Sequence, residues 1–160
     1  GYLPLAATFA TEKIFEAFLG EPWEGKTFYH GHTYTGNPLA CAAAIASLEL
    51  FEKNNLIAQV QQKAQALSEM LKPLADLPHV GDIRQKGLMV GIELVEDKAS
   101  KKPFDPRRRL GAEVCARIRR HGVILRPLAD TIVLMPPLAM TVEQLRRIVD
   151  AVREEVAVVR

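Results

Sequence analysis

Residues 88–94 read LMVGIEL, and this stretch decides how the second part of the chain folds. Large aliphatic residues stand at every second position of it, which is the period that predicts a β-strand with one buried face. The elements predicted after it are a helix over 107–121, strands over 123–126 and 131–135 on either side of a turn at 127–130, and a capped helix that begins after Thr141. This order predicts a small α+β domain in which helices cover one face of a sheet.

Upstream of this domain, the pattern predicts a strand and three helices. Residues 3–8 form an apolar run typical of a strand, and residues 11–19 have a helical pattern. Asn37 and Pro38 supply an N-cap and a proline at the first helical position, so a long helix is predicted to begin there. A third helix, with leucines and valines on one face, is predicted to end near Pro73, whose ring nitrogen has no hydrogen to donate.

Composition narrows the class of protein. The 160 residues include 21 Lys and Arg and 19 Asp and Glu, which gives a formal net charge of +2, and 48% are hydrophobic. These values favour a packed core and lack the basic excess typical of nucleic-acid binders. No apolar run reaches the roughly 18 residues of a membrane span, so we expect a cytoplasmic protein without a membrane segment. The chain begins at Gly1 inside an apolar run, and we interpret it as a fragment or processed product.

The loop at 25–36 is the first candidate for chemistry. It is rich in glycine and aromatic residues, and it directly precedes the predicted long helix. The hydroxyl of Thr33 and nearby backbone N–H groups would lie close to the positive end of that helix, an arrangement that suits a phosphate. Alternatively, Thr33 and Thr35 only complete the hydrogen bonds of turns. His30 and His32 have no acidic or cysteine ligand beside them, so we expect no metal site.

Arg126 is the second candidate. It follows three aliphatic residues and precedes Pro127, and a guanidinium in an apolar setting costs desolvation unless it has a partner. Its planar fork fits a carboxylate, so a substrate acid would suit it. A structural ion pair with one of the 19 acidic residues is the alternative, and local sequence alone favours that alternative.

Five parts of the chain together carry a family resemblance. They are residues 1–8 (GYLPLAAT), 28–42 (FYHGHTYTGNPLACA), 80–84 (VGDIR) with Gly87 and Gly91, 126–128 (RPL), and 134–138 (LMPPL). The chain resembles the C-terminal portion of a class III pyridoxal-phosphate aminotransferase. The last two segments resemble most the biotin-pathway members, which transfer an amino group to 8-amino-7-oxononanoate to give 7,8-diaminononanoate.

The resemblance implies a fold and a division of the chain. The parent would have the α/β architecture of the type I fold of pyridoxal-phosphate enzymes. Residues 1–54 would form the end of its large cofactor-binding domain and the connecting helix, and residues 55–160 its small C-terminal α+β domain. The family active site is built from two subunits, so the resemblance also implies a homodimer.

The resemblance also assigns roles to four residues. Thr33 would bind the phosphate of pyridoxal 5'-phosphate in the partner's active site, and His32 would contribute to the same phosphate site. Gly31 would line the substrate pocket. Arg126 would pair with the carboxylate of the keto acid.

No catalytic residue is expected within this chain. The lysine that forms the Schiff base in the family lies a few residues before the stretch that matches Gly1 onward, and no lysine present here stands at that position. We therefore expect the 160 residues by themselves to lack transaminase activity. Two alternatives stay open: another class III aminotransferase that acts on an ω-amine, and a non-catalytic α+β module that binds an anion or forms a dimer. The amino donor, S-adenosylmethionine or lysine, is also left open.

Overall fold

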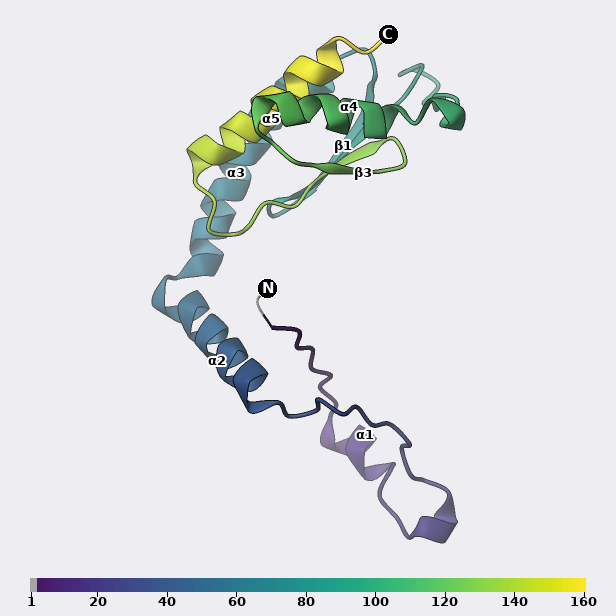
Figure 1. Ribbon diagram of the computed structural model, residues 1–160, viewed down its shortest axis with the longest axis vertical. Coiled ribbons are helices and arrows are strands. Elements are labelled where there is room, and N and C mark those ends of the chain that lie inside the picture. The colour runs from purple at the N-terminus through teal and green to yellow at the C-terminus, as the bar shows by residue number, and fades with distance from the viewer. Residues whose placement is uncertain (1–2) are drawn as a thin grey trace. The chain divides into compact units, whose positions relative to one another are not determined.

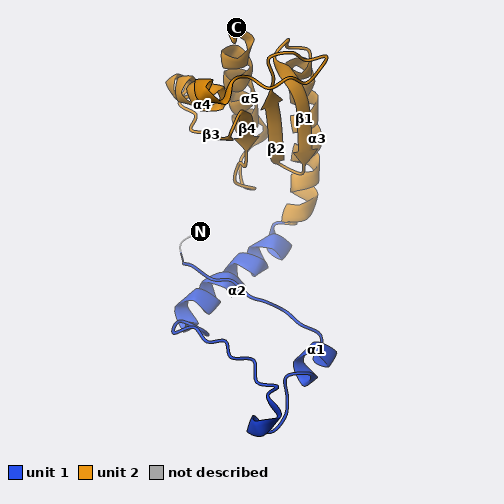
Figure 2. Ribbon diagram, turned by 90° about the vertical axis from the view of Figure 1, so that its right-hand side faces the viewer, with its two compact units in different colours: residues 1–54 blue, residues 55–160 orange. Residues whose placement is uncertain are grey.

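The computed structural model describes residues 3–160. The chain divides into two compact units, residues 1–54 and residues 55–160, which Figure 2 shows in different colours. Gly1 and Tyr2, the first two residues of the segment that carries the family resemblance, lie outside the described part.

The described part of unit 1 contains two α-helices and one 3-10 turn. Its elements are α1 (Glu12–Glu16), η1 (Pro22–Glu24) and α2 (Pro38–Lys53). The predicted start of the long helix is confirmed, because the side chain of Asn37 caps α2 by accepting a hydrogen bond from the amide of Ala40 at 3.0 Å. The loop that runs into α2 is thereby tied to the first turn of the helix.

Two predictions for unit 1 are wrong. Residues 3–8 form no strand, because a strand requires a hydrogen-bonded neighbour and no described residue pairs with this segment. The helix predicted over 11–19 ends at Glu16. After it, the amides of Phe18 and Leu19 bond to carbonyls three residues back, which is a turn and not a continued α-helix.

Unit 2 is a four-stranded antiparallel sheet with helices on one face (Figures 1 and 2). Its elements are α3 (Leu56–Ala75), β1 (Val80–Lys86), β2 (Met89–Leu94), η2 (Pro106–Arg108), α4 (Leu110–Ile118), η3 (Arg119–His121), β3 (Arg126–Leu128), β4 (Thr131–Leu134) and α5 (Val142–Ala157). The strand order is β1-β2-β4-β3. The predicted combination of a small sheet with helices on one face is confirmed, as is the capping box of Thr141 and Gln144 that begins α5.

Several element boundaries in unit 2 differ from the prediction. The sequence analysis missed β1, whose polar residues conceal its period, although β1 pairs with β2 along its length. The strand predicted over 123–126 instead begins at Arg126, and the turn is only two residues long because Leu128 pairs with Thr131. Helix α3 continues two residues past Pro73, since the buried Leu74 holds its last turn against the core. The helix predicted over 107–121 is α for nine residues and 3-10 on both sides.

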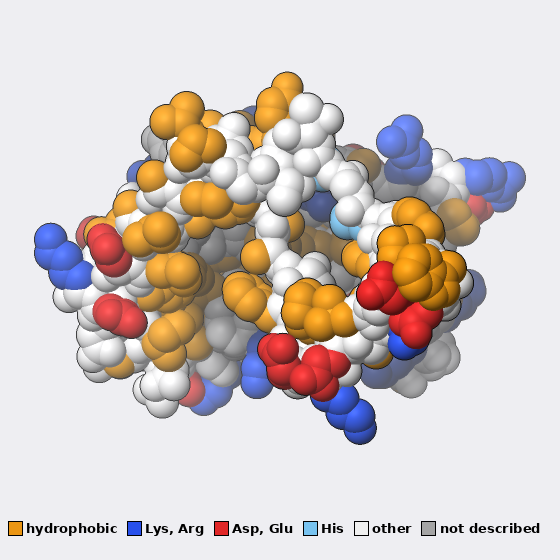
Figure 3. Space-filling view, turned by 90° about the horizontal axis from the view of Figure 1, so that it is seen from below, with side chains coloured by type: hydrophobic (Ala, Val, Ile, Leu, Met, Phe, Trp, Pro, Cys, Tyr) orange, Lys and Arg blue, Asp and Glu red, His pale blue; other side chains and the backbone are white. Residues whose placement is uncertain are grey.

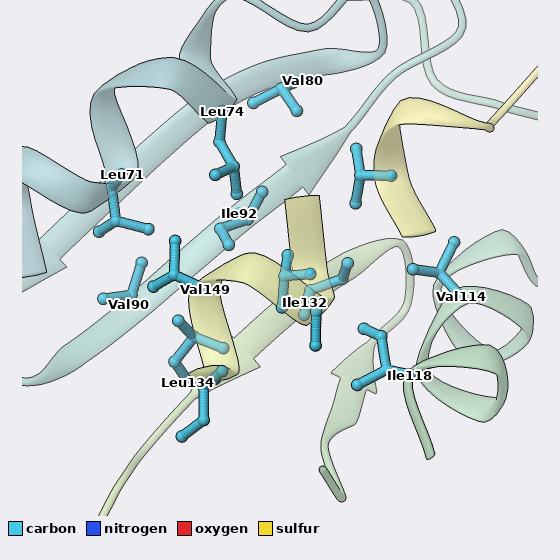
Figure 4. Close-up of a cluster of buried hydrophobic side chains, with 14 of the residues drawn as sticks. Leu71, Leu74, Val80, Val90, Ile92, Val114, Ile118, Ile132, Leu134 and Val149 are labelled. Atoms are coloured by element: carbon cyan, nitrogen blue, oxygen red, sulfur yellow. The ribbon is translucent and has the colours of Figure 1, made fainter. Parts of the chain in front are cut away.

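One hydrophobic cluster holds unit 2 together (Figure 4). Alternate residues of β2 and β4 point to the same side, and Ile92 and Ile132 are fully buried there. Leu74 of α3, Ile118 of α4 and Val152 of α5 are equally buried in the cluster. The period of two in the strands therefore separates a face that packs against helices from a face that the helices leave open.

A buried carboxylate links the C-terminal helix to the rest of the unit. Glu155 of α5 is 7% exposed, and it accepts hydrogen bonds from Arg117 Nε at 2.9 Å and pairs with His121 Nε2 at 2.8 Å. Arg120 lies 3.3 Å away from it. The hydrogen bond with His121, followed by that with Arg117, holds the pKa of Glu155 below its ordinary value.

No helix among the described residues is long and apolar enough to cross a bilayer.

Truncation of the buried Ile132 should lower the stability of unit 2. We expect Ile132→Ala to lower the free energy of unfolding by about 2–5 kcal/mol, because it removes a buried side chain and leaves a cavity. The control is Ile124→Ala, whose side chain is 83% exposed and should cost less than about 0.5 kcal/mol. Urea unfolding measures both values, and equal losses would contradict this description of the core.

The Glu155 network predicts a pH-dependent stability. At pH 7, Glu155→Gln should lower the free energy of unfolding by about 1–3 kcal/mol, because Arg117 and His121 lose a charged partner. Since the native pKa lies below the ordinary 4.5, this contribution is complete above pH 4.5 and is lost as the pH falls through the native pKa. Wild type and variant should therefore converge in acid when unfolding is measured over a pH series, and a constant difference would contradict the assignment.

Candidate functional site

The loop before α2 is exposed and is organised by its own backbone. The amide of Thr35 donates to the carbonyl of His32 at 3.0 Å, and the amide of Asn37 donates to the carbonyl of Tyr34 at 3.1 Å. Two consecutive turns thus lead into the capped helix. They leave Gly31, His32 and Thr33 on the solvent side of the loop.

Thr33 is exposed, and neither its hydroxyl nor its amide is hydrogen-bonded to another described residue. The alternative in which the Thr33 hydroxyl completes a turn therefore does not apply. The hydroxyl and amide of Thr33 are thus adjacent free donors, and they lie four residues before the N-cap of α2. An anion can accept hydrogen bonds from both groups.

His32 has a specific local role. Its Nδ1 accepts a hydrogen bond from the amide of Tyr34 at 3.2 Å, so the neutral ring carries its hydrogen on Nε2, which remains a donor. His32, His30 and Tyr34 line a hollow of about 630 Å³ together with residues of the extended segment 4–8. Thr33 and Gly31 do not line it.

The described residues contain no group of three or more His, Cys, Asp or Glu arranged to hold a metal ion. His30 stacks on Phe28 with ring centroids 5.5 Å apart, and His32 lies against Tyr34 at 5.9 Å.

Arg126 is the first residue of β3, and its side chain is exposed. The ion-pair alternative from the sequence analysis is wrong, because no described acidic residue pairs with Arg126. The desolvation argument for Arg126 does not apply, since the strand begins at this residue and its side chain is exposed. Arg126 instead contributes the one charged side chain of a hollow of about 400 Å³. The other residues that line this hollow are mostly apolar, namely Gly122, Val123, Ile124, Leu125, Val133, Leu134, Met135, Pro136, Pro137, Met140 and Ile148.

The position of Arg126 is set by the turn that follows it. The amide of Gly111, in the first turn of α4, donates to Asp130 Oδ1 at 2.8 Å. A Cβ at Gly111 would collide with the carbonyl oxygen of Ala129, so only glycine allows the turn to lie so close to the helix. Ala129 has a left-handed φ of 50° in this turn. The contact with α4 thus holds the hairpin that presents Arg126.

A second arginine lies on the same face of the sheet. Arg84 of β1 donates from Nη1 to Asp82 Oδ2 at 2.8 Å and to Glu93 Oε2 at 2.7 Å. The hydrogen bond from Arg84 lowers the pKa of Asp82, which keeps that carboxyl ionised. The sequence analysis did not detect the alignment of Arg84 with Arg126, because the alignment depends on a strand that it missed.

Comparison with known proteins identifies the family. The family model described as aminotransferase class III matches residues 1–156. The chain belongs to the class III aminotransferase family. The resemblance inferred from the sequence is thereby confirmed.

The relatives match nearly all of this chain, but their own sequences are much longer. The adenosylmethionine-8-amino-7-oxononanoate aminotransferase of Geobacter sulfurreducens is 53% identical over 98% of this chain and 34% of its own length. A crystal structure of the protein of that name from Methanocaldococcus jannaschii is 47% identical, with a TM-score of 0.93 over 98% of this chain and 36% of that one. An amine transaminase from an uncultivated Pseudomonas species, in a PLP-bound form, is 36% identical with a TM-score of 0.90 over 98% of this chain and 36% of that one. The chain spans about a third of the length of these relatives and has the corresponding part of an aminotransferase fold.

Proposed function

We propose that the protein containing these residues is a pyridoxal-phosphate aminotransferase that converts 8-amino-7-oxononanoate to 7,8-diaminononanoate in biotin synthesis. Relatives at 53% and 47% identity carry the name of that activity. The observation that carries the proposal is the free guanidinium of Arg126 beside a mostly apolar hollow. Such a site fits an acid with one carboxylate on an aliphatic chain.

Arg126 would orient the substrate. A bidentate pair with the carboxylate fixes one end of the chain, and the apolar wall excludes water from the methylene groups beside it. The ketone and amine, which are remote from the carboxylate, are then held away from Arg126 and toward the reacting centre.

The loop before α2 fits the phosphate of pyridoxal 5'-phosphate. The hydroxyl and amide of Thr33 are unpaired donors within the described residues, and Nε2 of His32 is a third donor nearby. All three would donate to phosphate oxygens. When bound, the cofactor supplies an electron sink for moving the amino group, and the loop supplies its anchorage.

We also propose a homodimer in which the Thr33 loop completes the partner's site. Unit 1 exposes many large apolar side chains, and hydrophobic patches are plain on the surface in Figure 3. Phe9 is 91% exposed, Tyr29 88% and Trp23 82%. An apolar surface of this kind favours burial in an assembly. In this assignment residues 1–54 end the large domain and include the connecting helix, and residues 55–160 form the small domain.

Arg126→Ala in the full-length protein should weaken keto-acid binding about tenfold to a hundredfold, because a charge-assisted pair is lost. The affinity of Arg126→Lys for the keto acid should lie between those of wild type and Arg126→Ala, since lysine keeps the charge but lacks the planar guanidinium. Steady-state kinetics measure this effect, and the expected result is a raised KM for the keto acid. The control is Arg146→Ala on α5, an exposed arginine outside this hollow. Unchanged affinity in Arg126→Ala would favour a class III enzyme that acts on another ω-amine.

Thr33→Ala should weaken binding of pyridoxal 5'-phosphate about tenfold, because a hydroxyl donor to a phosphate is removed. A cofactor titration followed by absorbance measures this, and Thr35→Ala is the matched control.

Mixing Thr33→Ala subunits with Arg126→Ala subunits then tests whether the site is shared between subunits. If the two residues serve a site from different subunits, random dimers regain about a quarter of the wild-type sites. No recovery would place both residues in the site of one subunit.

A further inference from the structure

The segment that follows β4 forms part of the wall of the Arg126 hollow. Residues 135–141 join β4 to α5 and form neither helix nor strand. The members of this segment that line the hollow are Met135, Pro136, Pro137 and Met140. The two prolines have no amide hydrogen, so neither can be fixed by donating to a neighbouring strand. The position of this part of the wall therefore depends on other contacts.

A turn and a lysine side chain hold the segment in place. The amide of Met140 donates to the carbonyl of Pro137 at 3.0 Å, which closes a turn over residues 137–140. Inside this turn, the carbonyl of Leu138 accepts a hydrogen bond from Nζ of Lys63 at 2.8 Å. Lys63 thus binds the turn between the two of its residues that line the hollow, Pro137 and Met140.

Lys63 can fix the turn because its own helix is fixed. Leu67, one turn further along α3, is 1% exposed and belongs to the hydrophobic cluster. Gln85 of β1 donates to the carbonyl of Ala64, the residue next to Lys63, at 2.9 Å. Lys63 is half-buried, and no described carboxylate pairs with it. Its ammonium group is therefore available to the carbonyl of Leu138, and a charged donor forms a stronger hydrogen bond than a neutral one.

We propose that Lys63 is a positioning residue for the substrate. Its hydrogen bond to Leu138 holds the 137–140 turn at the hollow, so that the apolar wall covers the aliphatic chain of an acid bound at Arg126. The inference rests on the proposed function, because it takes Arg126 as the carboxylate ligand.

This role predicts a dependence on the length of the ligand. Lys63 does not line the hollow, so it acts on the ligand only through the wall. A wall that is already in place binds the chain without first being ordered, and more of the binding free energy is then kept as affinity. The effect of Lys63 should therefore grow with the number of methylene groups in the acid.

The experiment compares a long acid with one that has no methylene group. Nonanoate is titrated by calorimetry into the full-length protein, and acetate is measured by its competition with nonanoate at constant ionic strength. In Lys63→Met, nonanoate should bind about fourfold to fifteenfold more weakly, the effect of one or two methylene groups that lose their apolar cover. Acetate, which reaches only the guanidinium of Arg126, should change less than about twofold.

Two further variants separate the hydrogen bond from the loss of a charge. Lys63→Arg keeps a charged N–H donor on a long side chain and should recover most of the affinity for nonanoate. Lys72→Met removes the same charge from the same helix, at an exposed lysine that pairs with Glu69, and should leave both affinities unchanged. Urea unfolding confirms that each variant is folded before binding is compared. A general loss of order would weaken the binding of both acids, which the acetate measurement detects.

The outcomes distinguish this proposal from the function on which it rests. If Arg126→Ala weakens the binding of nonanoate, the assignment of Arg126 stands. An unchanged affinity of Lys63→Met for nonanoate then overturns the role of Lys63 alone. An equal loss for acetate, a loss that Lys72→Met shares, or no recovery in Lys63→Arg also overturns it. If nonanoate binding does not depend on Arg126, the proposed function fails first.

Discussion

The packing of alternate β2 side chains against three helices is the interaction on which the rest of unit 2 depends. Ile92 is fully buried with Ile132 of the neighbouring strand, and both are in the cluster that holds α3, α4 and α5. A strand cannot shift by one residue without moving this set to solvent. The same constraint therefore fixes which residues lie on the open face, including Gly91 and the arginines aligned with it.

The two candidate regions use different physical means to stay available for a ligand. The Thr33 loop is held by its own turns and by the cap of α2, and the Thr33 hydroxyl and amide have no partner among residues 3–160. Arg126 has apolar neighbours and no described acidic partner, and it is positioned by the hairpin that packs on Gly111. In both places secondary structure satisfies the surrounding polar groups, and the candidate residue is left with unused hydrogen-bonding capacity within the described part of the chain.

Prediction from sequence succeeded where a local signal is strong, and it failed where the pairing of strands decides the secondary structure. The N-cap at Asn37 and the capping box at Thr141 were predicted, because a side chain and a nearby amide are sufficient to form them. The strand at 3–8 was predicted and does not form, since apolar residues specify a strand only when a neighbour is present. The strand at 80–86 was missed because pairing with β2 outweighs its polar composition.

The sequence by itself determined the family, the presence of the long helices, and which residues are candidates for the site, namely Gly31, His32, Thr33 and Arg126. These conclusions follow from motifs and periods that are read along the chain. Only the tertiary structure decided that Arg84 is occupied by two carboxylates and that Arg126 is free of any described one. The reason is that ion pairing across a sheet depends on strand register, which brings together residues that no local pattern relates.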